Sequence, residues 1–230
     1  MPITTCIFDA YGTLFDVSAA ARRAAAEPDH ACLAGHWAEF AVTWREKQLD
    51  YTWLRAITGA HADFRQVTGE ALDWALEAHG LAGEAGLRAR LMALYRDLDA
   101  YPEAPAMLGA LRRAGKATAI LSNGSPGMLA DAVAAAGMDG LFDDLLSVET
   151  VGIYKPHPSV YDLVGQHFGC DRSEVLFVSS NGWDAAAAAG YGFVTAWVDR
   201  NRAPVERLPW RPAHVLHDLA EIPSLVEALS

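Results

Sequence analysis

The chain has 230 residues, with 18 Lys and Arg against 29 Asp and Glu, so its formal net charge is −11. Hydrophobic residues make up 52% of the sequence and charged residues 20%, which excludes a disordered chain and supplies enough apolar side chains for a full core. The acidic balance argues against nucleic acid as a partner, because binding to a phosphate backbone needs clustered Lys and Arg. A small anionic ligand is compatible with it, since a few local cations can dominate one pocket.

The three cysteines, Cys6, Cys32 and Cys170, are an odd number and show neither Cys-x-x-Cys nor Cys/His ligand spacing. A disulfide framework or a zinc site is therefore not expected. The sequence shows no basic start followed by an apolar stretch, and no run of about 20 apolar residues. These observations predict a cytoplasmic protein without a membrane partner.

The first predicted strand covers 3–8, which is β-branched and apolar, and a turn follows it. From about residue 16 to residue 99 the chain is rich in Ala, Leu, Trp and Arg at helical spacing. Arg45 and Leu49 are four residues apart and share one face of a helix in this stretch. A different, apolar face of this stretch is predicted from residues near a 3.6-residue period: Leu33, Trp37, Phe40, Trp44, Tyr51 and Leu54.

The rest of the chain alternates strands with helices. Helices are predicted over 70–79 and 84–97 within the helical stretch, then over 103–114, 126–137, 159–168 and 184–189, and at the C-terminus. Strands are predicted over 116–121, 144–148, 175–178 and 193–198, and near 214–216. The alternation predicts an α/β fold with a doubly wound, parallel, Rossmann-like sheet. We expect a core domain of residues 1–15 and 100–230, and an all-helical cap domain of residues 16–99 inserted after the first strand.

Polar residues follow the predicted strands, and in open α/β sheets ligands bind beyond the carboxyl ends of the strands. We expect these segments to converge on one edge of the sheet and to form a site. The alternative is ordinary capping and turn chemistry, to which Ser, Asn and Asp are also suited. The set, in chain order, is Asp9, Thr13, Ser122, Asn123, Lys155, Ser179, Ser180, Asn181 and Asp184.

In this order the segments resemble the haloacid dehalogenase superfamily. The matching segments are FDAYGTLFD (8–16), SNG (122–124), YKP (154–156) and SSNGWD (179–184). Together with WREKQLDYTWL (44–54), the last segment resembles the L-2-haloacid dehalogenases of that superfamily. The resemblance covers nearly the whole chain, including the position of the helical insert.

Two positions separate dehalogenase chemistry from the Mg²⁺-dependent phosphatase chemistry of most superfamily members. Phosphatases of this type carry a second aspartate two residues after the nucleophile and a metal-binding acid four residues before the last aspartate. Here these positions are Tyr11 and Ser180. A phosphoryl group needs its charge neutralised and an alkoxide needs a general acid, whereas a halide leaves as a stable anion. The two departures therefore favour a dehalogenase without metal or other cofactor.

The resemblance implies a reaction and a role for each residue. Asp9 would attack Cα of a short L-2-haloalkanoate, with haloacetates as further candidates, and form an ester that water hydrolyses to the D-2-hydroxy acid. Arg45, with Asn123, would hold the departing halide. Ser122 and the backbone N–H groups near Ala10 and Tyr11 would hold the substrate carboxylate.

The remaining roles also follow from the resemblance. Lys155 would keep Asp9 ionised, and Asp184 would orient Lys155 and activate the hydrolytic water. Thr13, Ser179 and Asn181 would fix these carboxylates by hydrogen bonds, with Tyr161 near the site. An apolar wall would consist of Tyr11, Leu49, Phe64 and Trp183. Some of the tryptophans of the cap, which are Trp37, Trp44, Trp53 and Trp74, would form a homodimer interface as in relatives.

Two alternatives stay open. A phosphatase acting on a small metabolite would depend on Mg²⁺, and a non-catalytic relative would bind carboxylates or a protein without turnover. The residues at 11 and 180 count against the first alternative, and the presence of Asp9, Lys155 and Asp184 counts against the second.

Overall fold

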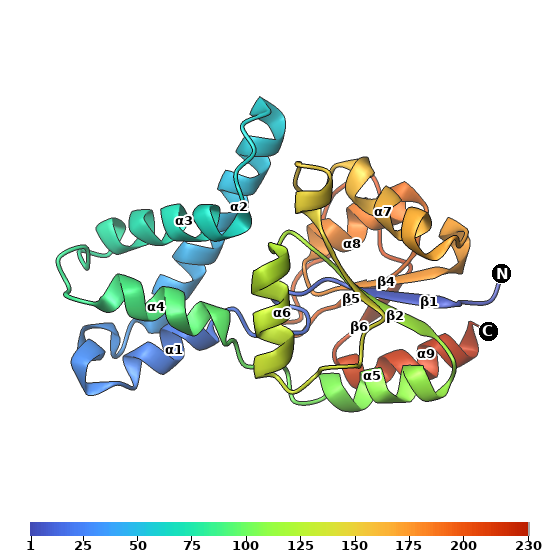
Figure 1. The fold of residues 1–230 in the computed structure, drawn as a ribbon, viewed down its shortest axis with the longest axis horizontal. Coiled ribbons are helices and arrows are strands. Elements are labelled where there is room, and N and C mark those ends of the chain that lie inside the picture. Colours follow the sequence, from blue (N-terminus) through green and yellow to red (C-terminus); the bar gives the residue numbers. More distant parts are fainter. Residues whose placement is uncertain (230) are drawn as a thin grey trace.

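In the computed structural model, which describes residues 1–229, a group of helices stands beside a sheet that is covered by helices (Figure 1). We call the group of helices the helical body and the rest the sheet body. The helical body contains α1 (Ala19–Ala25), α2 (Trp37–Thr58), α3 (Phe64–Ala78) and α4 (Leu87–Arg96).

The sheet has six strands, all parallel, in the order β3-β2-β1-β4-β5-β6. The central strand β1 is buried along its length and pairs with both β2 and β4, so the segments that follow these three strands are neighbours in space. The predicted parallel α/β fold is therefore confirmed. The strands are β1 (Thr5–Phe8), β2 (Ala117–Ser122), β3 (Asp144–Ser147), β4 (Val175–Ser179), β5 (Val194–Val198) and β6 (His214–Leu216).

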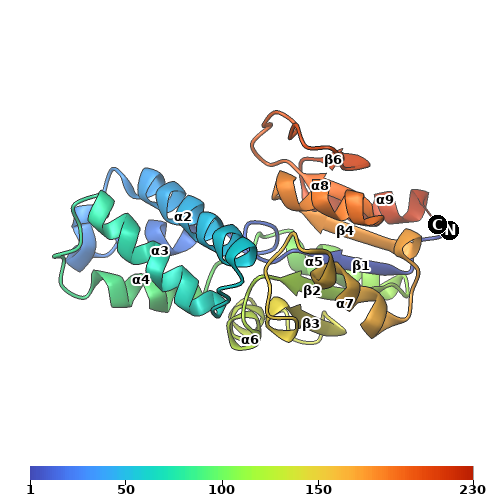
Figure 2. The ribbon, with the colours of Figure 1, turned by 90° about the horizontal axis from the view of Figure 1, so that it is seen from above.

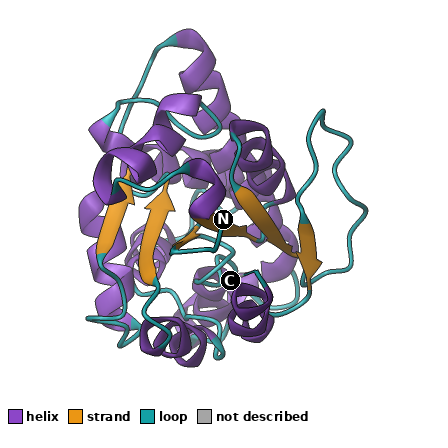
Figure 3. Cartoon of the chain, turned by 90° about the vertical axis from the view of Figure 1, so that its right-hand side faces the viewer, coloured by secondary structure: helices purple, strands orange, loops and turns teal. Residues whose placement is uncertain are grey.

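Helices cover both faces of the sheet (Figures 1 and 3). On one face lie α5 (Ala104–Arg113) and α9 (Ile222–Ala228), and on the other lie α7 (Pro158–Phe168) and α8 (Gly182–Tyr191). Helix α6 (Pro126–Ala135) lies between the sheet and the helical body. None of the helices in residues 1–229 has the length and apolar character needed to cross a membrane.

The carboxyl ends of the central strands point toward the helical body, and the two chain termini lie together at the opposite end of the molecule (Figure 2). This direction follows from the connectivity, because the segment after β1 leads directly into the helical body and the chain returns from it to α5. The candidate residues that follow the strands therefore lie where the two bodies meet.

The buried face of α2 includes the predicted Phe40 and Trp44 but differs from the prediction beyond them. Its buried residues include two polar side chains, Gln48 and Thr52, whereas Leu54 is 56% exposed and Leu33 precedes the helix in a 3-10 turn. The prediction was wrong for Leu54 because the face of α2 that packs against α3 is centred on Trp44 and Gln48, about one quarter-turn away. Periodicity of apolar residues alone does not detect a face that contains buried polar groups.

Helix α3 begins at Phe64, six residues before the predicted start at 70. The side chain of Asp63 accepts a hydrogen bond from the backbone N–H of Gln66 at 2.8 Å and thereby caps the helix. The earlier start places Phe64 in the first turn, where its backbone N–H donates to Glu149 of the sheet body at 3.2 Å. His61 also contacts Glu149, at 3.2 Å, so this carboxylate ties the two bodies together.

Candidate active site

Asp9 lies directly after β1 and is only 6% exposed. One carboxylate oxygen, Oδ2, accepts hydrogen bonds from Thr13 Oγ1 at 3.0 Å and from Asn181 Nδ2 at 2.8 Å. The other oxygen, Oδ1, lies 3.2 Å from Lys155 Nζ. A turn after β1, in which the backbone carbonyl of Ala10 accepts from three successive N–H groups, brings Thr13 back to Asp9. Four predicted residues from three segments thus meet at one carboxylate.

Lys155 joins two buried carboxylates. Its Nζ lies 2.8 Å from Asp184 Oδ2 as well as 3.2 Å from Asp9 Oδ1. The hydroxyl of Tyr161 donates to the second oxygen of Asp184 at 2.7 Å, and the ring of Phe177 lies beneath the ammonium group at 5.0 Å. A buried charge is tolerated only when it is paired and hydrogen-bonded, and here both conditions are met.

Burial and charge pairing act in opposite directions on the protonation of this group. Burial alone would lower the pKa of Lys155, but the charges of Asp184 and Asp9 outweigh it and raise the pKa above the ordinary value of a lysine. Burial raises the pKa of Asp184, against the effect of the Lys155 charge, and burial together with Asp184 raises the pKa of Tyr161. Lys155 and Tyr161 therefore keep their protons and donate hydrogen bonds at neutral pH.

Arg45 reaches the same place from the helical body. Its Nη2 donates to the backbone carbonyl of Tyr11 at 3.1 Å and lies 3.3 Å from Asn181 Oδ1, while Nη1 donates to Gln48 at 2.7 Å. Since Asn181 also holds Asp9, one amide links the guanidinium group to the carboxylate. The arginine of the helical body and the aspartate of the sheet body therefore belong to one site.

Gln48 and Tyr95 were not predicted as site residues. Gln48 is buried, and its amide nitrogen lies 2.7 Å from Thr68 Oγ1 and 3.1 Å from the hydroxyl of Tyr95. These bonds orient the amide oxygen that receives Arg45. Gln48 stands three residues after Arg45, so a polar residue at helical spacing was the signal available in the sequence. No local pattern indicated Tyr95, which comes from α4.

Tyr11 contributes its ring to an aromatic cluster. The ring stacks on Tyr95 with centroids 5.6 Å apart and packs against Phe64 at 5.3 Å. The close packing extends to the SNG segment, where a Cβ added to Gly124 would lie 2.7 Å from Cε2 of Tyr11. This explains why the chain has glycine at that position. Phe64 and Tyr11 are in contact, as an apolar wall requires.

Trp183 and Leu49 lie on opposite sides of the contact between the two bodies. Trp183 is in the first turn of α8 and packs edge-on against Trp53 of α2, with ring centroids 5.4 Å apart. Leu49 lies one helical turn after Arg45 on α2 and is half-buried. Because Trp53 lies one further turn along, Leu49 is placed between the guanidinium group and the tryptophan pair.

Three predicted residues hold the loops of the site. Ser122 accepts from the backbone N–H of Gly124 at 3.0 Å, and Asn123 accepts from the N–H of Lys155 at 3.0 Å. Ser179 accepts from the N–H of Asn181 at 3.1 Å, whereas the prediction had its hydroxyl bonded to a carboxylate. The physical reason is that the turn into α8 leaves an N–H group next to this hydroxyl, which satisfies it locally.

The two positions that distinguish the phosphatases carry no acid and lie within the site region. The side chain of Tyr11 belongs to the aromatic cluster, and the Ser180 hydroxyl is buried without a hydrogen-bond partner. Within residues 1–229, no group of three or more His, Cys, Asp and Glu side chains is arranged to hold a metal ion.

The protein combines a parallel α/β sheet with a buried Asp–Lys–Asp centre beneath an arginine from a helical body, and the family that matches this chain is one of hydrolases. A family model of haloacid dehalogenase-like hydrolases matches residues 3–192. The chain is 44% identical to (S)-2-haloacid dehalogenase 1 of Pseudomonas sp. (strain CBS-3), covering 100% of this chain and 99% of that one.

Solved structures agree with this match. A crystal structure of an L-2-haloacid dehalogenase superposes with a TM-score of 0.92 at 41% identity, covering 99% of this chain and 100% of the other. A second, from Xanthobacter autotrophicus with chloropropionic acid covalently bound, gives a TM-score of 0.88 at 37% identity, again with 99% and 100% coverage. The chain belongs to the L-2-haloacid dehalogenase family.

Proposed function

We propose that this protein hydrolyses short-chain L-2-haloalkanoic acids to D-2-hydroxy acids. The observation that carries the proposal is the Asp9 carboxylate, which is held by Thr13, Asn181 and Lys155 and linked through Asn181 to Arg45. The site combines the anionic Asp9 with two cations, Lys155 and Arg45. This combination suits a substrate that carries a carboxylate and releases a halide ion. The covalently bound chloropropionic acid in the relative from Xanthobacter autotrophicus supports the same chemistry.

In the first step, an oxygen of Asp9 attacks Cα of the substrate from the side opposite the halogen. The new C–O bond forms as the carbon–halogen bond breaks, the bonding electron pair leaves with the halide, and the configuration at Cα inverts. Arg45 reaches the site from the helical side and supplies positive charge to the departing halide. Asn123 would assist, and Ser122 with the backbone near Ala10 and Tyr11 would bind the substrate carboxylate.

In the second step, water attacks the carboxyl carbon of the Asp9 ester. Asp184 takes one proton of the water, the bond between the carboxyl carbon and the ester oxygen breaks, and Asp184 returns this proton to the leaving oxygen, so that the 2-hydroxy acid departs; the second water proton is released to solvent as Asp9 returns to a carboxylate. Lys155 lies 3.2 Å from Oδ1 of Asp9 and stabilises the negative charge that develops on that oxygen. Tyr161 and Lys155 together orient Asp184.

The helical body acts as a cap in this proposal. Residues 16–99 would form the cap domain, and residues 1–15 with 100–230 the core domain. Covering the site excludes water and strengthens the attraction between Arg45 and the halide. The apolar wall of Tyr11, Leu49, Phe64 and Trp183 contributes to this exclusion.

We also propose that the protein is a homodimer. Among the four tryptophans of the helical body, Trp44 is buried and Trp74 is 42% exposed, with Lys47 over its ring. Val42 and Leu54 add exposed apolar side chains on the neighbouring α2. Such a patch on α2 and α3 suits contact with a second copy. A cytoplasmic location stays a prediction from the sequence.

The test is halide release from the separate isomers of 2-chloropropionate in the presence of EDTA. We expect chloride from the L isomer, D-lactate as the product, and no phosphate from an aryl phosphate run in parallel; chloroacetate tests the smallest substrate. A single turnover in oxygen-18 water should leave the label in Asp9, because water attacks the carboxyl carbon. Mg²⁺-dependent phosphate release without any chloride would contradict the proposal.

A further inference from the structure

Two stretches of chain run between the sheet body and the helical body, and they pair with each other. We call them the connectors: residues 13–16 lead from the turn after β1 toward α1, and residues 99–103 lead from α4 back to α5. Phe15 and Ala100 form an antiparallel bridge, and backbone hydrogen bonds of 2.8 and 2.9 Å flank it. Because the first connector begins in the turn that holds Asp9, the position of this carboxylate depends on how the connectors are held.

The side chain of Arg200, which comes two residues after β5, contacts both connectors. Its Nη2 donates to the backbone carbonyl of Thr13 in the first connector at 3.3 Å. In the second connector, Glu103 Oε1 lies 2.7 Å from Nη1, and the centre of the Tyr101 ring lies 3.6 Å from the guanidinium carbon. A planar guanidinium group can pair with a carboxylate, stack on a ring and donate to a carbonyl at the same time, so one side chain bridges the two connectors.

The backbone that carries Arg200 is fixed to the edge of the sheet. The N–H of Asp199 donates to the carbonyl of Leu216 at the end of β6, at 2.7 Å. The Asp199 side chain accepts from the N–H of Ala203 at 2.9 Å and closes the turn after Arg200. The guanidinium group is therefore presented to the connectors from a fixed base.

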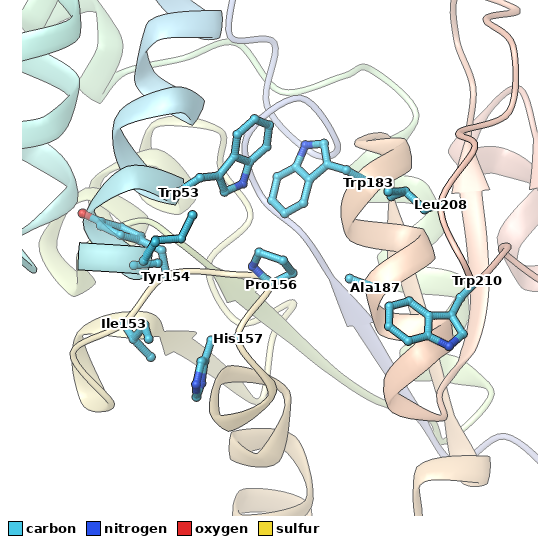
Figure 4. Close-up of a pocket in the computed structure, with 11 residues that line it drawn as sticks. Trp53, Ile153, Tyr154, Pro156, His157, Trp183, Ala187, Leu208 and Trp210 are labelled. Carbon is cyan, nitrogen blue, oxygen red and sulfur yellow. The ribbon is translucent and has the colours of Figure 1, made fainter. Parts of the chain in front are cut away.

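The same loop is also held against α8 further along. The ring of Trp210 lies over Gly190, where an added Cβ would come within 2.3 Å of it, so glycine at this position lets the tryptophan pack down on the helix. Trp210 and Leu208 line an apolar pocket of about 640 Å³, across from Trp53 of α2 (Figure 4). The loop between β5 and β6 therefore belongs to the sheet body on both sides of this pocket.

Thr13 links Arg200 to Asp9. Thr13 is fully buried, and its hydroxyl donates to Oδ2 of Asp9 at 3.0 Å and accepts from the backbone N–H of Ser180 at 2.8 Å. The direction of this hydroxyl follows from the position of the Thr13 backbone, and Arg200 holds the carbonyl of that backbone. A shift of the first connector would move the hydroxyl away from Asp9.

We propose that Arg200 is a positioning residue for the dehalogenation, which holds the Thr13 turn so that Asp9 keeps the orientation needed to attack Cα. The inference rests on the function proposed above. The groups that would bind the substrate are on other elements, since Arg45 belongs to α2 and Ser122 ends β2. Loss of Arg200 should therefore slow the chemical step and leave substrate binding nearly unchanged.

The experiment measures chloride release from L-2-chloropropionate in a single turnover, with enzyme in excess, which reports the first chemical step. Arg200→Met should lower the maximal rate by about tenfold and change the half-saturating concentration by less than about twofold. Arg22→Met is the matched control. Arg22 also joins the two connectors, but through the side chains of Asp16 and Asp99 instead of the Thr13 carbonyl, so the rate should stay within about twofold of the unmodified value.

A double-mutant cycle tests whether Arg200 acts through Thr13. Thr13→Val removes the hydroxyl and keeps the branched shape of the side chain. When Arg200→Met is added to Thr13→Val, the rate should fall by less than about twofold further, because the bond that Arg200 supports is already absent. A further tenfold loss in the double variant would overturn the inference, since Arg200 would then act independently of this hydroxyl.

The inference and the proposed function fail differently. No chloride from the unmodified protein would overturn both. An unchanged rate in Arg200→Met, or equal losses in Arg200→Met and Arg22→Met, would overturn the inference and leave the dehalogenase intact. If circular dichroism shows that Arg200→Met does not fold, Arg200→Lys replaces it. Lysine keeps the charge near Glu103 but lacks the planar group that reaches Thr13, so the rate should fall by about threefold or more, and an unchanged rate would overturn the inference.

Discussion

The two sides of the site are built differently. On the sheet side, Asp9, Lys155, Asp184 and Tyr161 are buried and joined by hydrogen bonds of 2.7 to 3.2 Å. On the helical side, Arg45 is partly buried and makes two hydrogen bonds to the sheet body, at 3.1 and 3.3 Å. The comparison teaches that the groups that would form and break bonds follow the strands of the sheet body. The arginine that would bind the departing halide belongs to the separate helical body.

The largest expected effect is at the centre of the sheet side. Asp9→Asn removes the anionic nucleophile and should lower kcat for L-2-chloropropionate by roughly 10⁴-fold or more. The amide keeps the shape of the side chain, so the melting temperature by circular dichroism should change little by comparison. Full activity in this folded variant would show that the reaction does not use Asp9.

A second substitution tests the charge pairing on the same side. Lys155→Met leaves Asp9 and Asp184 buried without their cation, which should cost about 3–5 kcal/mol of unfolding free energy, and activity should be lost. The measurement is urea unfolding at pH 8. Lys47→Met removes a partly exposed pair with Asp50 and should cost less than about 1 kcal/mol, which makes it the matched control.

The same variant has a pH dependence with a definite sign. The folded state raises the pKa of Lys155 above the ordinary lysine value of 10.5, so its stabilising contribution is fully present below that pH. The contribution declines as the pH rises through the interval between the unfolded and folded pKa values. The difference in unfolding free energy between the unmodified protein and Lys155→Met should therefore shrink above pH 10.5. A difference that grows in this range would contradict the pairing.

Arg45→Lys tests the helical side and should have an intermediate effect. Lysine keeps the charge but cannot reach Gln48, the Tyr11 carbonyl and Asn181 together from one planar group. We expect kcat to fall by about 10²-fold, a loss typical of one misplaced electrostatic contact, with little loss of stability. If the departing halide is the partner of Arg45, the loss should be larger for chloride than for bromide, which leaves more easily.

The smallest effect is expected where the two bodies are joined. Glu149→Gln weakens the bonds to His61 and to the backbone N–H of Phe64. We expect a loss of about 1 kcal/mol in unfolding free energy, the usual value of one hydrogen bond, and a decrease in kcat of less than about tenfold. A loss as large as that of Lys155→Met would show that the helical body, and not the strand ends, holds the site together.

Much of the site could be predicted because its residues follow strands. The alternation of strands and helices determined a parallel sheet, and the carboxyl ends of parallel strands share one edge, so Asp9, Lys155 and Asp184 had to be near one another. The superfamily resemblance then selected the chemistry through Tyr11 and Ser180. These inferences depend on local order along the chain, which a single sequence displays directly.

Other features were decided only by the tertiary structure. Gln48, Tyr95 and the exposure of Leu54 depend on how α2 packs against α3 and α4, and the pocket between Trp53 and Trp210 joins segments that are far apart in the chain. Side chains from distant segments meet according to helix rotation and packing, which spacing along the sequence does not specify. The sequence by itself therefore determined the sheet, the order of the candidate site segments and the reaction class, while packing decided which side chains hold the arginine and where the apolar pocket lies.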